Sequence, residues 1–210
     1  MNKNEIAYQK IKEMIFQEII TNNSGISENS LVEKLNMSRT PIRSALQRLN
    51  FEGIIRIVPN QGIIIQELSI EEAREKFDLR AAVELYIVKK TIDLVCEEDI
   101  DNLCDILHRQ SVAYSKKDFY AFLKCDMEFH TYFLKYYKNK SMSDIMFNFR
   151  ERFYTLSLRG LKKRNDRQME EALKEHHDIV SALEKHDFVA TINLVEKHIN
   201  NSILELIRMN

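Results

Sequence analysis

Helix-breaking residues are concentrated at the start of this 210-residue chain and are nearly absent from the rest. Both prolines, Pro41 and Pro59, and three of the four glycines lie within the first 62 residues, and only Gly160 follows them. A long stretch that keeps a regular spacing of apolar residues without such breakers is typical of a helical bundle. The sequence therefore predicts a small first domain over residues 1–68 and an all-helical second domain over residues 69–210.

Composition and cysteine usage indicate a cytoplasmic protein. Hydrophobic residues make up 44% of the chain and charged residues 30%, which is ordinary for a globular protein with a core. No run approaches about 18 consecutive apolar residues, so we expect no transmembrane helix and no membrane partner. Three cysteines without a Cys-x-x-Cys pair suit reduced thiols. The net charge of −1 argues against indiscriminate coating of nucleic acid, but not against sequence-specific DNA binding.

Apolar spacing in the first domain predicts three helices and a β-hairpin. A first helix is expected over residues 4–21 from a stripe that recurs every three or four positions, namely Tyr8, Ile11, Ile15 and Ile19. Ser27 can cap a short second helix, and Thr40 followed by Pro41 is a typical start for a third. Strand-forming residues then occupy positions 54–58 and 63–65, and turn residues occupy positions 59–62 between them. This order predicts a β-hairpin.

The second and third of these helices have the spacing of a helix-turn-helix, and the hairpin behind them occupies the place of a wing. Ser38, Arg39, Thr40 and Arg43 crowd the first turn of the third helix, the end that contacts base edges and phosphates. Cations at a helix N-terminus oppose the helix dipole, so a purely structural helix tends to avoid them. Arg48 lies further along and could reach the DNA backbone.

Residues 38–49, Ser-Arg-Thr-Pro-Ile-Arg-Ser-Ala-Leu-Gln-Arg-Leu, followed by Glu-Gly-Ile-Ile, closely resemble the signature of the GntR family of bacterial transcription regulators. The resemblance implies that Arg39, Thr40 and Arg43 contact operator DNA. It also implies that Gly62, with Gln61 beside it, marks the tip of a wing that enters the minor groove.

Two positions depart from the family pattern. Asn29 stands where family members often carry an arginine, and the wing sequence around Gln61 is less basic than usual. We therefore expect the operator affinity or the preferred flanking sequence to differ.

Six helices are predicted in the second domain, at about residues 69–95, 97–114, 117–137, 141–160, 166–185 and 187–208. Ser69 and Glu72 have the Ser-x-x-Glu form of a capping box that starts the first of them. Its apolar stripe is read as Leu79, Val83, Tyr86 and Val95. Bulky aromatic residues supply the expected core, namely Phe119, Phe122, Phe129, Phe133, Phe147, Phe149 and Phe153.

Ionisable residues on these apolar faces suggest a metal site. Asp126 and His130 are four residues apart and share a helix face, while His176 and His198 lie on the apolar sides of two later helices. One carboxylate and three imidazoles from three helices can thus converge, and such donors suit a first-row divalent transition metal. His108, His177 and His186 are expected at the surface.

Residues 69–210 resemble the FCD effector domain of FadR-like GntR regulators, in which an aspartate and three histidines often hold a metal. By that resemblance Asp126, His130, His176 and His198 are the ligands. The ion is expected to be Zn²⁺, with Ni²⁺, Mn²⁺ or Fe²⁺ as alternatives.

FCD regulators typically sense organic acids, and four protein ligands leave two positions on an octahedral ion for a small carboxylate. Arg80 and Arg150 are candidates to bind that anion because arginine pairs carboxylates bidentately. A salt bridge between helices is the alternative for both arginines.

The combined hypothesis is a cytoplasmic repressor that binds a near-palindromic operator as a homodimer and responds to a small carboxylate. Two alternatives remain open at this point. One is a regulator that binds an apolar acyl ligand without metal. The other is a metalloenzyme with an accessory helix-turn-helix, although no general base beyond the ligands and no nucleophile motif accompanies the four residues.

Overall fold

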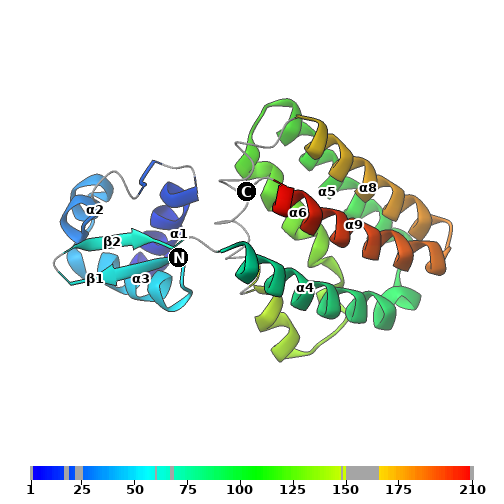
Figure 1. Cartoon of the computed structure of the whole chain (residues 1–210), viewed down its shortest axis with the longest axis horizontal. Helices are drawn as coiled ribbons and strands as arrows, with labels where there is room; N and C mark the ends of the chain where they lie inside the picture. Colours follow the sequence, from blue (N-terminus) through cyan, green and yellow to red (C-terminus); the bar gives the residue numbers. More distant parts are fainter. Residues whose placement is uncertain are drawn as a thin grey trace. The chain divides into compact units, whose positions relative to one another are not determined.

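The computed structural model describes residues 2–16, 19–21, 26–59, 61–66, 69–147, 149 and 166–208. The described residues form two compact units, which divide between residues 66 and 69 (Figure 1). The first holds three helices and a two-stranded sheet, and the second is helical throughout its described part. The predicted fold class is therefore confirmed.

In the first unit, α1 (Lys3–Phe16), α2 (Glu28–Leu35) and α3 (Arg39–Phe51) precede the hairpin of β1 (Ile55–Val58) and β2 (Gly62–Ile65). The strands are antiparallel, with Ile55 opposite Ile65 and Val58 opposite Gly62. Helices α1 and α3 pack together over a core of fully buried apolar residues that includes Tyr8, Ile11, Leu31, Ile42, Leu49 and Ile54.

Local chemistry accounts for the boundaries of α2 and α3. The Ser27 hydroxyl accepts a hydrogen bond from the Ser30 backbone N–H at 3.1 Å, which confirms Ser27 as the cap of α2. Thr40 as the cap of α3 was wrong, because Ser38 holds that position and Arg39 and Thr40 are already helical. Pro41 then falls at the third helical position. A proline is tolerated there because the first four N–H groups of a helix have no intrahelical partner.

Gly62 lets the hairpin approach the segment before α2. Its φ is +94°, and a Cβ at this position would lie 2.7 Å from the Ile26 carbonyl oxygen. That same oxygen accepts a hydrogen bond from the Ile63 N–H at 3.0 Å. A larger residue at position 62 would therefore be strained and would separate the wing from the helix-turn-helix.

The first helix is shorter than predicted. It ends at Phe16 instead of continuing to residue 21, and Ile19 is 53% exposed. The Ile20 N–H donates to the Met14 carbonyl oxygen at 3.2 Å, and Ile20 is buried. The chain therefore leaves the helical period and places Ile20, not Ile19, in the core.

The second unit contains α4 (Ile70–Thr91), the short η2 (Ile92–Leu94), α5 (Glu97–Ser115), α6 (Phe119–His130), η3 (Tyr132–Lys135), α8 (Asp166–Glu184) and α9 (Phe188–Arg208). Residues 140–147 are also helical. Helix α5 packs on α6 and α8, and α9 packs on α4 and α8 (Figure 1). The Ser69 capping box is confirmed, since the Ser69 hydroxyl accepts from the Glu72 N–H and the Glu72 carboxylate accepts from the Ser69 N–H.

Two expectations for this unit were wrong in detail. Helix α6 stops at His130 instead of running to residue 137; the Thr131 hydroxyl donates to the Met127 carbonyl at 2.7 Å, and a 3-10 turn follows. Along α4, Val83 is buried as predicted, but Leu79 is 49% and Tyr86 41% exposed. The buried face of α4 is rotated because Phe77, Arg80, Ile87 and Thr91 pack inward instead.

The predicted aromatic core is present in part. Phe122, Phe129, Phe133 and Phe149 are buried, Phe119 is half-buried, and Phe147 is 38% exposed. Phe153 lies outside the described residues. His108, His177 and His186 are exposed as expected.

None of the helices in the described ranges is both long enough and apolar enough to cross a membrane.

Candidate metal centre and nucleic-acid interface

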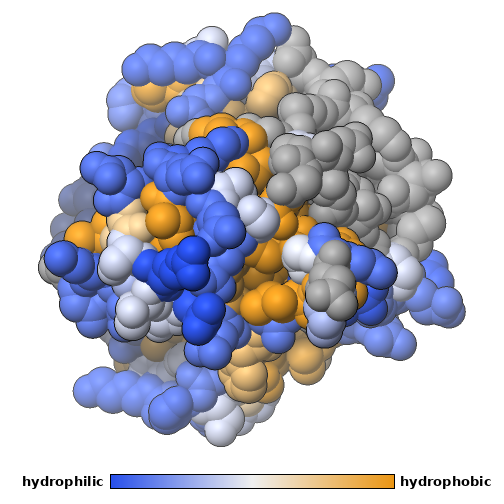
Figure 2. Space-filling view, turned by 90° about the vertical axis from the view of Figure 1, so that its left-hand side faces the viewer, coloured by the Kyte–Doolittle hydropathy of each residue, from blue (hydrophilic) through white to orange (hydrophobic). Residues whose placement is uncertain are grey.

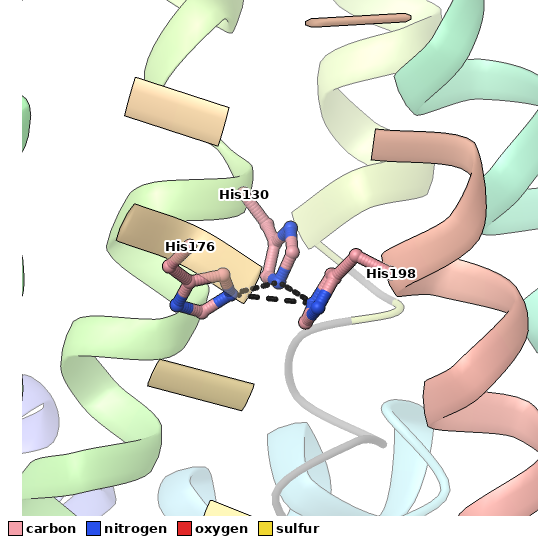
Figure 3. Close-up of side chains that lie close together, drawn as sticks. All are labelled: His130, His176 and His198. Atoms are coloured by element: carbon pink, nitrogen blue, oxygen red, sulfur yellow. Dashed lines mark hydrogen bonds between the residues drawn. The ribbon is translucent and has the colours of Figure 1, made fainter. Parts of the chain in front are cut away.

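Three buried histidines meet in the interior of the helical unit. His130 comes from α6, His176 from α8 and His198 from α9, and each is at most 6% exposed. Their Nε2 atoms point toward one another, at 3.3 Å between His130 and His176, 3.2 Å between His176 and His198, and 3.1 Å between His198 and His130 (Figure 3). The sequence pattern therefore places three imidazole nitrogens within reach of one ion.

The opposite ring nitrogen of each histidine has its own partner. His130 Nδ1 lies 2.6 Å from Glu84 Oε1, His176 Nδ1 lies 3.0 Å from Gln110 Oε1, and His198 Nδ1 lies 2.8 Å from Glu175 Oε2. Carboxylate and amide oxygens only accept hydrogen bonds, so each Nδ1 must carry the proton. In a neutral imidazole the Nε2 atom then presents a lone pair. The three lone pairs face one another.

Burial disfavours the charged forms of His130 and His176. It lowers the pKa of His130, with further lowering from the nearby Arg80 charge, and it holds the pKa of His176 well below its usual value together with the neighbouring His198. Nitrogens bound at about 2.1 Å to a common ion are about 3.0 Å apart in octahedral coordination and about 3.4 Å apart in tetrahedral coordination. The observed separations fall between these two values, so the triad fits a metal ion.

Asp126 supplies a fourth donor beside the triad. Its Oδ1 lies 3.7 Å from His176 Nε2 and its Oδ2 lies 3.9 Å from His130 Nε2. The Gln110 amide nitrogen donates to Asp126 Oδ1 at 3.2 Å. Gln110 is fully buried, so one amide orients both His176 and Asp126. The structure thus brings together the four residues singled out in the sequence.

Carboxyl groups surround the triad. Glu84 contacts both His130 and Arg80, whose Nε donates to Glu84 Oε2 at 2.9 Å. Burial opposes ionisation of Glu84, but His130 and Arg80 together lower its pKa to about 2. Burial likewise opposes ionisation of Glu175, and hydrogen bonds from His198 and Asn201 lower its pKa. Together with Asp126 these place three carboxyl groups around the triad, with the Arg80 guanidinium beside Glu84 and the Lys197 charge near Glu175.

The structure describes one of the two arginines expected to bind the effector, Arg80. Arg80 is 1% exposed, pairs with Glu84 one turn along α4, and lies near the rings of Phe77 and Phe149 at 5.7 and 5.3 Å. This ion pair lies within one helix. Arg150 lies outside the described residues.

Sequence reasoning missed the residues that orient the histidines, namely Glu84, Gln110 and Glu175. Each occupies an ordinary position on an amphipathic helix, and only the packing of α4, α5 and α8 around the triad gives it a role. The one local signal is that Glu175 directly precedes His176.

In the first unit, Ser38, Arg39, Thr40 and Arg43 are all exposed at the N-terminal end of α3. Arg43 forms a two-point ion pair with Glu28 at the start of α2, at 3.1 and 3.2 Å. Gln61 is exposed in the hairpin turn next to Gly62. Figure 2 looks onto the side where α2 and the hairpin lie in Figure 1, and hydrophilic residues cover much of that view.

Arg48 is held within the first unit. Its guanidinium lies 3.7 Å from the centre of the Tyr8 ring and forms ion pairs with Glu5 at 2.9 Å and Glu52 at 3.0 Å. The Tyr8 hydroxyl donates to the same Glu52 carboxylate at 2.8 Å. These contacts join α1 to α3 and favour a structural role over the DNA contact expected from the sequence.

Comparison with known proteins agrees with this architecture. Residues 3–65 match the family model described as "Bacterial regulatory proteins, gntR family", and residues 75–201 match the model of the FCD domain. Relatives include the HTH-type transcriptional repressor RspR of Escherichia coli, 25% identical over 93% of this chain and 85% of the relative. The gluconate operon transcriptional repressor of Bacillus licheniformis is 27% identical over 85% of this chain and 74% of its own length.

Solved structures show the same fold at low identity. E. coli McbR/YncC superposes with a TM-score of 0.84 at 18% identity, covering 99% of this chain and 98% of that one. A GntR regulator from Rhodococcus sp. RHA1 gives 0.85 at 16% identity, covering 99% of both chains. The matched families and relatives are transcription regulators and not enzymes, which removes the metalloenzyme alternative. The chain belongs to the GntR family of bacterial transcription regulators and carries an FCD domain.

Proposed function

We propose that this regulator is a metal-dependent repressor that senses a small carboxylic acid. Residues 1–68 bind double-stranded operator DNA, and residues 69–210 bind a divalent transition metal and the effector. A homodimer would place two recognition helices on a near-palindromic operator in the cytoplasm. The observation that carries the proposal is the buried triad, in which three Nε2 lone pairs meet at 3.1–3.3 Å while every Nδ1 is occupied.

A bound cation relieves the repulsion that this arrangement otherwise creates. His130, His176, His198 and Asp126 would hold it, with Glu84, Gln110 and Glu175 fixing the tautomers of the histidines. Imidazole with one carboxylate suits Zn²⁺, our first choice, as well as Ni²⁺, Mn²⁺ or Fe²⁺. When bound, the ion supplies Lewis acidity and open coordination positions for a carboxylate ligand.

Arg80 and Arg150 are the proposed contributors to anion binding. Arg80 acts through its charge, because its guanidinium is engaged with Glu84. A metal-free site for an apolar ligand is disfavoured, because the Nδ1 partners of the triad are carboxylates and an amide, although the Phe129 ring stacks on His176 at 4.2 Å.

Ser38, Arg39, Thr40 and Arg43 on α3, with Gln61 and Gly62 on the wing, are the proposed DNA contacts. Arg39 is the strongest candidate because it is exposed at the first position of α3. Arg43 would contact DNA either after its ion pair with Glu28 breaks or while that ion pair holds its guanidinium in position. Effector binding would alter operator affinity by a coupling free energy of about 1–3 kcal/mol.

The deciding measurement is the metal content of untagged protein. We expect about one transition-metal ion per chain in the wild type, and loss of the ion in a His176→Ala, His198→Ala double variant. His177→Ala is the matched control, because this neighbouring histidine is exposed and should leave the metal content unchanged. A wild-type protein that takes up no metal after reconstitution would exclude the metal site and leave a metal-free regulator.

A further inference from the structure

The hairpin of β1 and β2 is tied to the helix-turn-helix along both of its outer edges. On the β2 edge, the Ile63 N–H donates to the Ile26 carbonyl oxygen at 3.0 Å, next to the close approach of Gly62. On the β1 edge, the Ile57 N–H donates to the side-chain oxygen Oδ1 of Asn50 at 3.1 Å. The first contact joins two backbone atoms, whereas the second depends on the residue type at position 50.

Asn50 spans the connection between α3 and β1 with two oxygen atoms. Its backbone carbonyl accepts a hydrogen bond from the Gly53 N–H at 3.0 Å, where a φ of +69° turns the chain out of the helix. Its side-chain oxygen accepts from Ile57, which lies within β1. Short amide side chains are suited to such local bonds with the backbone. One residue in the last turn of α3 therefore fixes the chain at both ends of the segment that leads into the wing (Figure 1).

The outer half of β1 is less buried than the rest of the hairpin. Ile55, Ile63 and Ile65 are buried. Ile57 lies opposite Ile63 but is 45% exposed. Apolar packing therefore holds the base of the hairpin and the β2 strand, while the position of β1 at Ile57 depends more on its hydrogen bond to Asn50.

We propose that Asn50 is a positioning residue that orients the wing relative to the recognition helix and thereby determines how strictly the regulator reads the minor groove. The proposal rests on the proposed function, in which α3 reads the major groove and the wing tip enters the minor groove. The tip at Gln61 and Gly62 lies within five residues of Ile57 along the chain, so a shift of β1 at Ile57 is carried to the tip. Groups that recognise a ligand must be held within about 0.5 Å of the productive geometry. Asn50 acts through the wing and not by touching DNA.

Base analogues separate the readout of the two grooves. A duplex that the wild type selects from a random-sequence pool is remade with 2,6-diaminopurine for adenine, which adds an amino group in the minor groove as guanine does. It is also remade with 7-deazaguanine for guanine, which removes the N7 acceptor from the major groove. Each change should weaken binding by the wild type at least about 5-fold, the lower end of the cost of a wrong base pair. In Asn50→Ala the effect of 2,6-diaminopurine should shrink, while the effect of 7-deazaguanine stays the same.

Two variants and one measurement without DNA separate this role from a general effect on stability. Asn50→Asp keeps an oxygen acceptor and should retain the wild-type sensitivity to 2,6-diaminopurine, although its added charge lowers the affinity for every duplex. Phe51→Ala is the matched control, because this neighbouring side chain is 93% exposed, and it should behave as the wild type does. In hydrogen exchange, the Ile57 amide should exchange about 5-fold faster in Asn50→Ala than in the wild type or Asn50→Asp, the equivalent of one ordinary hydrogen bond.

The outcomes distinguish this inference from the proposed function. Equal sensitivity of the wild type and Asn50→Ala to 2,6-diaminopurine would overturn the role of Asn50 while leaving the regulator function intact. The same holds if the Ile57 amide exchanges at one rate in both proteins, if Asn50→Asp behaves as Asn50→Ala does, or if the wild type is indifferent to 2,6-diaminopurine. A wild-type protein that selects no duplex from the pool would overturn the proposed function, and this inference with it.

Discussion

Replacing Gln110 with leucine should weaken metal binding by about 10- to 100-fold, the usual cost of losing a group that orients metal ligands. Gln110 is fully buried and holds two candidate ligands at once, accepting from His176 Nδ1 at 3.0 Å and donating to Asp126 Oδ1 at 3.2 Å. Leucine fills a similar volume but makes neither hydrogen bond. His176 is then free to rotate or to take the other tautomer, and Asp126 loses its positioning partner.

The weaker metal affinity should also be measurable as a smaller metal-induced rise in melting temperature. Metal at 100 times its dissociation constant stabilises a folded protein by about 2.7 kcal/mol. With affinity weakened about 30-fold, the same free metal concentration contributes only about 0.9 kcal/mol. The metal-induced rise in melting temperature should therefore shrink by roughly 4–8 °C for a chain of this size. Metal affinity is measured directly in parallel by competition with a chelator.

Gln110→Glu is the matched control for the tautomer argument. A carboxylate at this position still accepts from His176, as Glu84 and Glu175 do for their histidines, but it cannot donate to Asp126, so metal affinity should fall less than in Gln110→Leu. Without metal, the added negative charge lies beside Asp126 and should destabilise the protein. If Gln110→Leu binds metal as tightly as the wild type, or if both variants lose affinity equally, the idea that this amide sets the state of His176 is wrong.

Two further perturbations test the remaining contacts. Arg48→Ala should lower the free energy of unfolding in urea by about 1–2 kcal/mol, because it removes the stacking on Tyr8 and the links between α1 and α3. It should reduce operator affinity less than Arg39→Ala does. The opposite ranking in a DNA-binding titration would restore Arg48 as a DNA contact. Asp99 is 1% exposed and accepts a hydrogen bond from Lys135 at 2.5 Å. Replacing Asp99 with alanine should therefore lower the free energy of unfolding by about 2–4 kcal/mol. Burial raises the pKa of Asp99, but hydrogen bonds, led by that of Lys135, hold it well below its usual value. Its contribution is therefore present above the unfolded-state pKa of about 3.9 and is lost as the pH falls below about 4; equal acid sensitivity of the wild type and Asp99→Asn in unfolding experiments would contradict this.

Features encoded by local chemistry could be predicted from the sequence. The Ser27 and Ser69 caps act within one turn of chain, so residue type and spacing suffice to identify them. The confinement of proline and glycine to the first 62 residues likewise separates the mixed domain from the helical one.

Features that depend on tertiary packing could not be predicted in the same way. A helical period includes Ile19 as readily as Ile15, but Ile19 is exposed and Ile20 is buried instead. Apolar spacing along α4 is compatible with a stripe through Leu79 and Tyr86, yet the polar Arg80 occupies the interior because Glu84 is there to pair with it. Hydrophobicity alone cannot reveal such a buried ion pair.

The candidate metal site contains residues that could be predicted from the sequence and residues that could not. His130, His176 and His198 lie on apolar helix faces, where imidazoles are conspicuous, and Asp126 shares the face of His130 four residues away. Nothing comparable distinguishes Glu84, Gln110 and Glu175 from the many other polar helix residues of the chain. Their role exists only once three helices have met, so it is a property of the bundle and not of any segment.

Helix α4 connects the candidate metal site to the rest of the helical unit. Its Glu84 contacts His130, and the helix packs against α9. Under the proposed function, a change at the triad that displaces Glu84 also moves α4, and such a movement would couple effector binding to DNA binding. Coupling of this kind is reciprocal in binding free energy. Operator DNA should therefore change the affinity for the effector by the same factor that the effector changes the affinity for DNA.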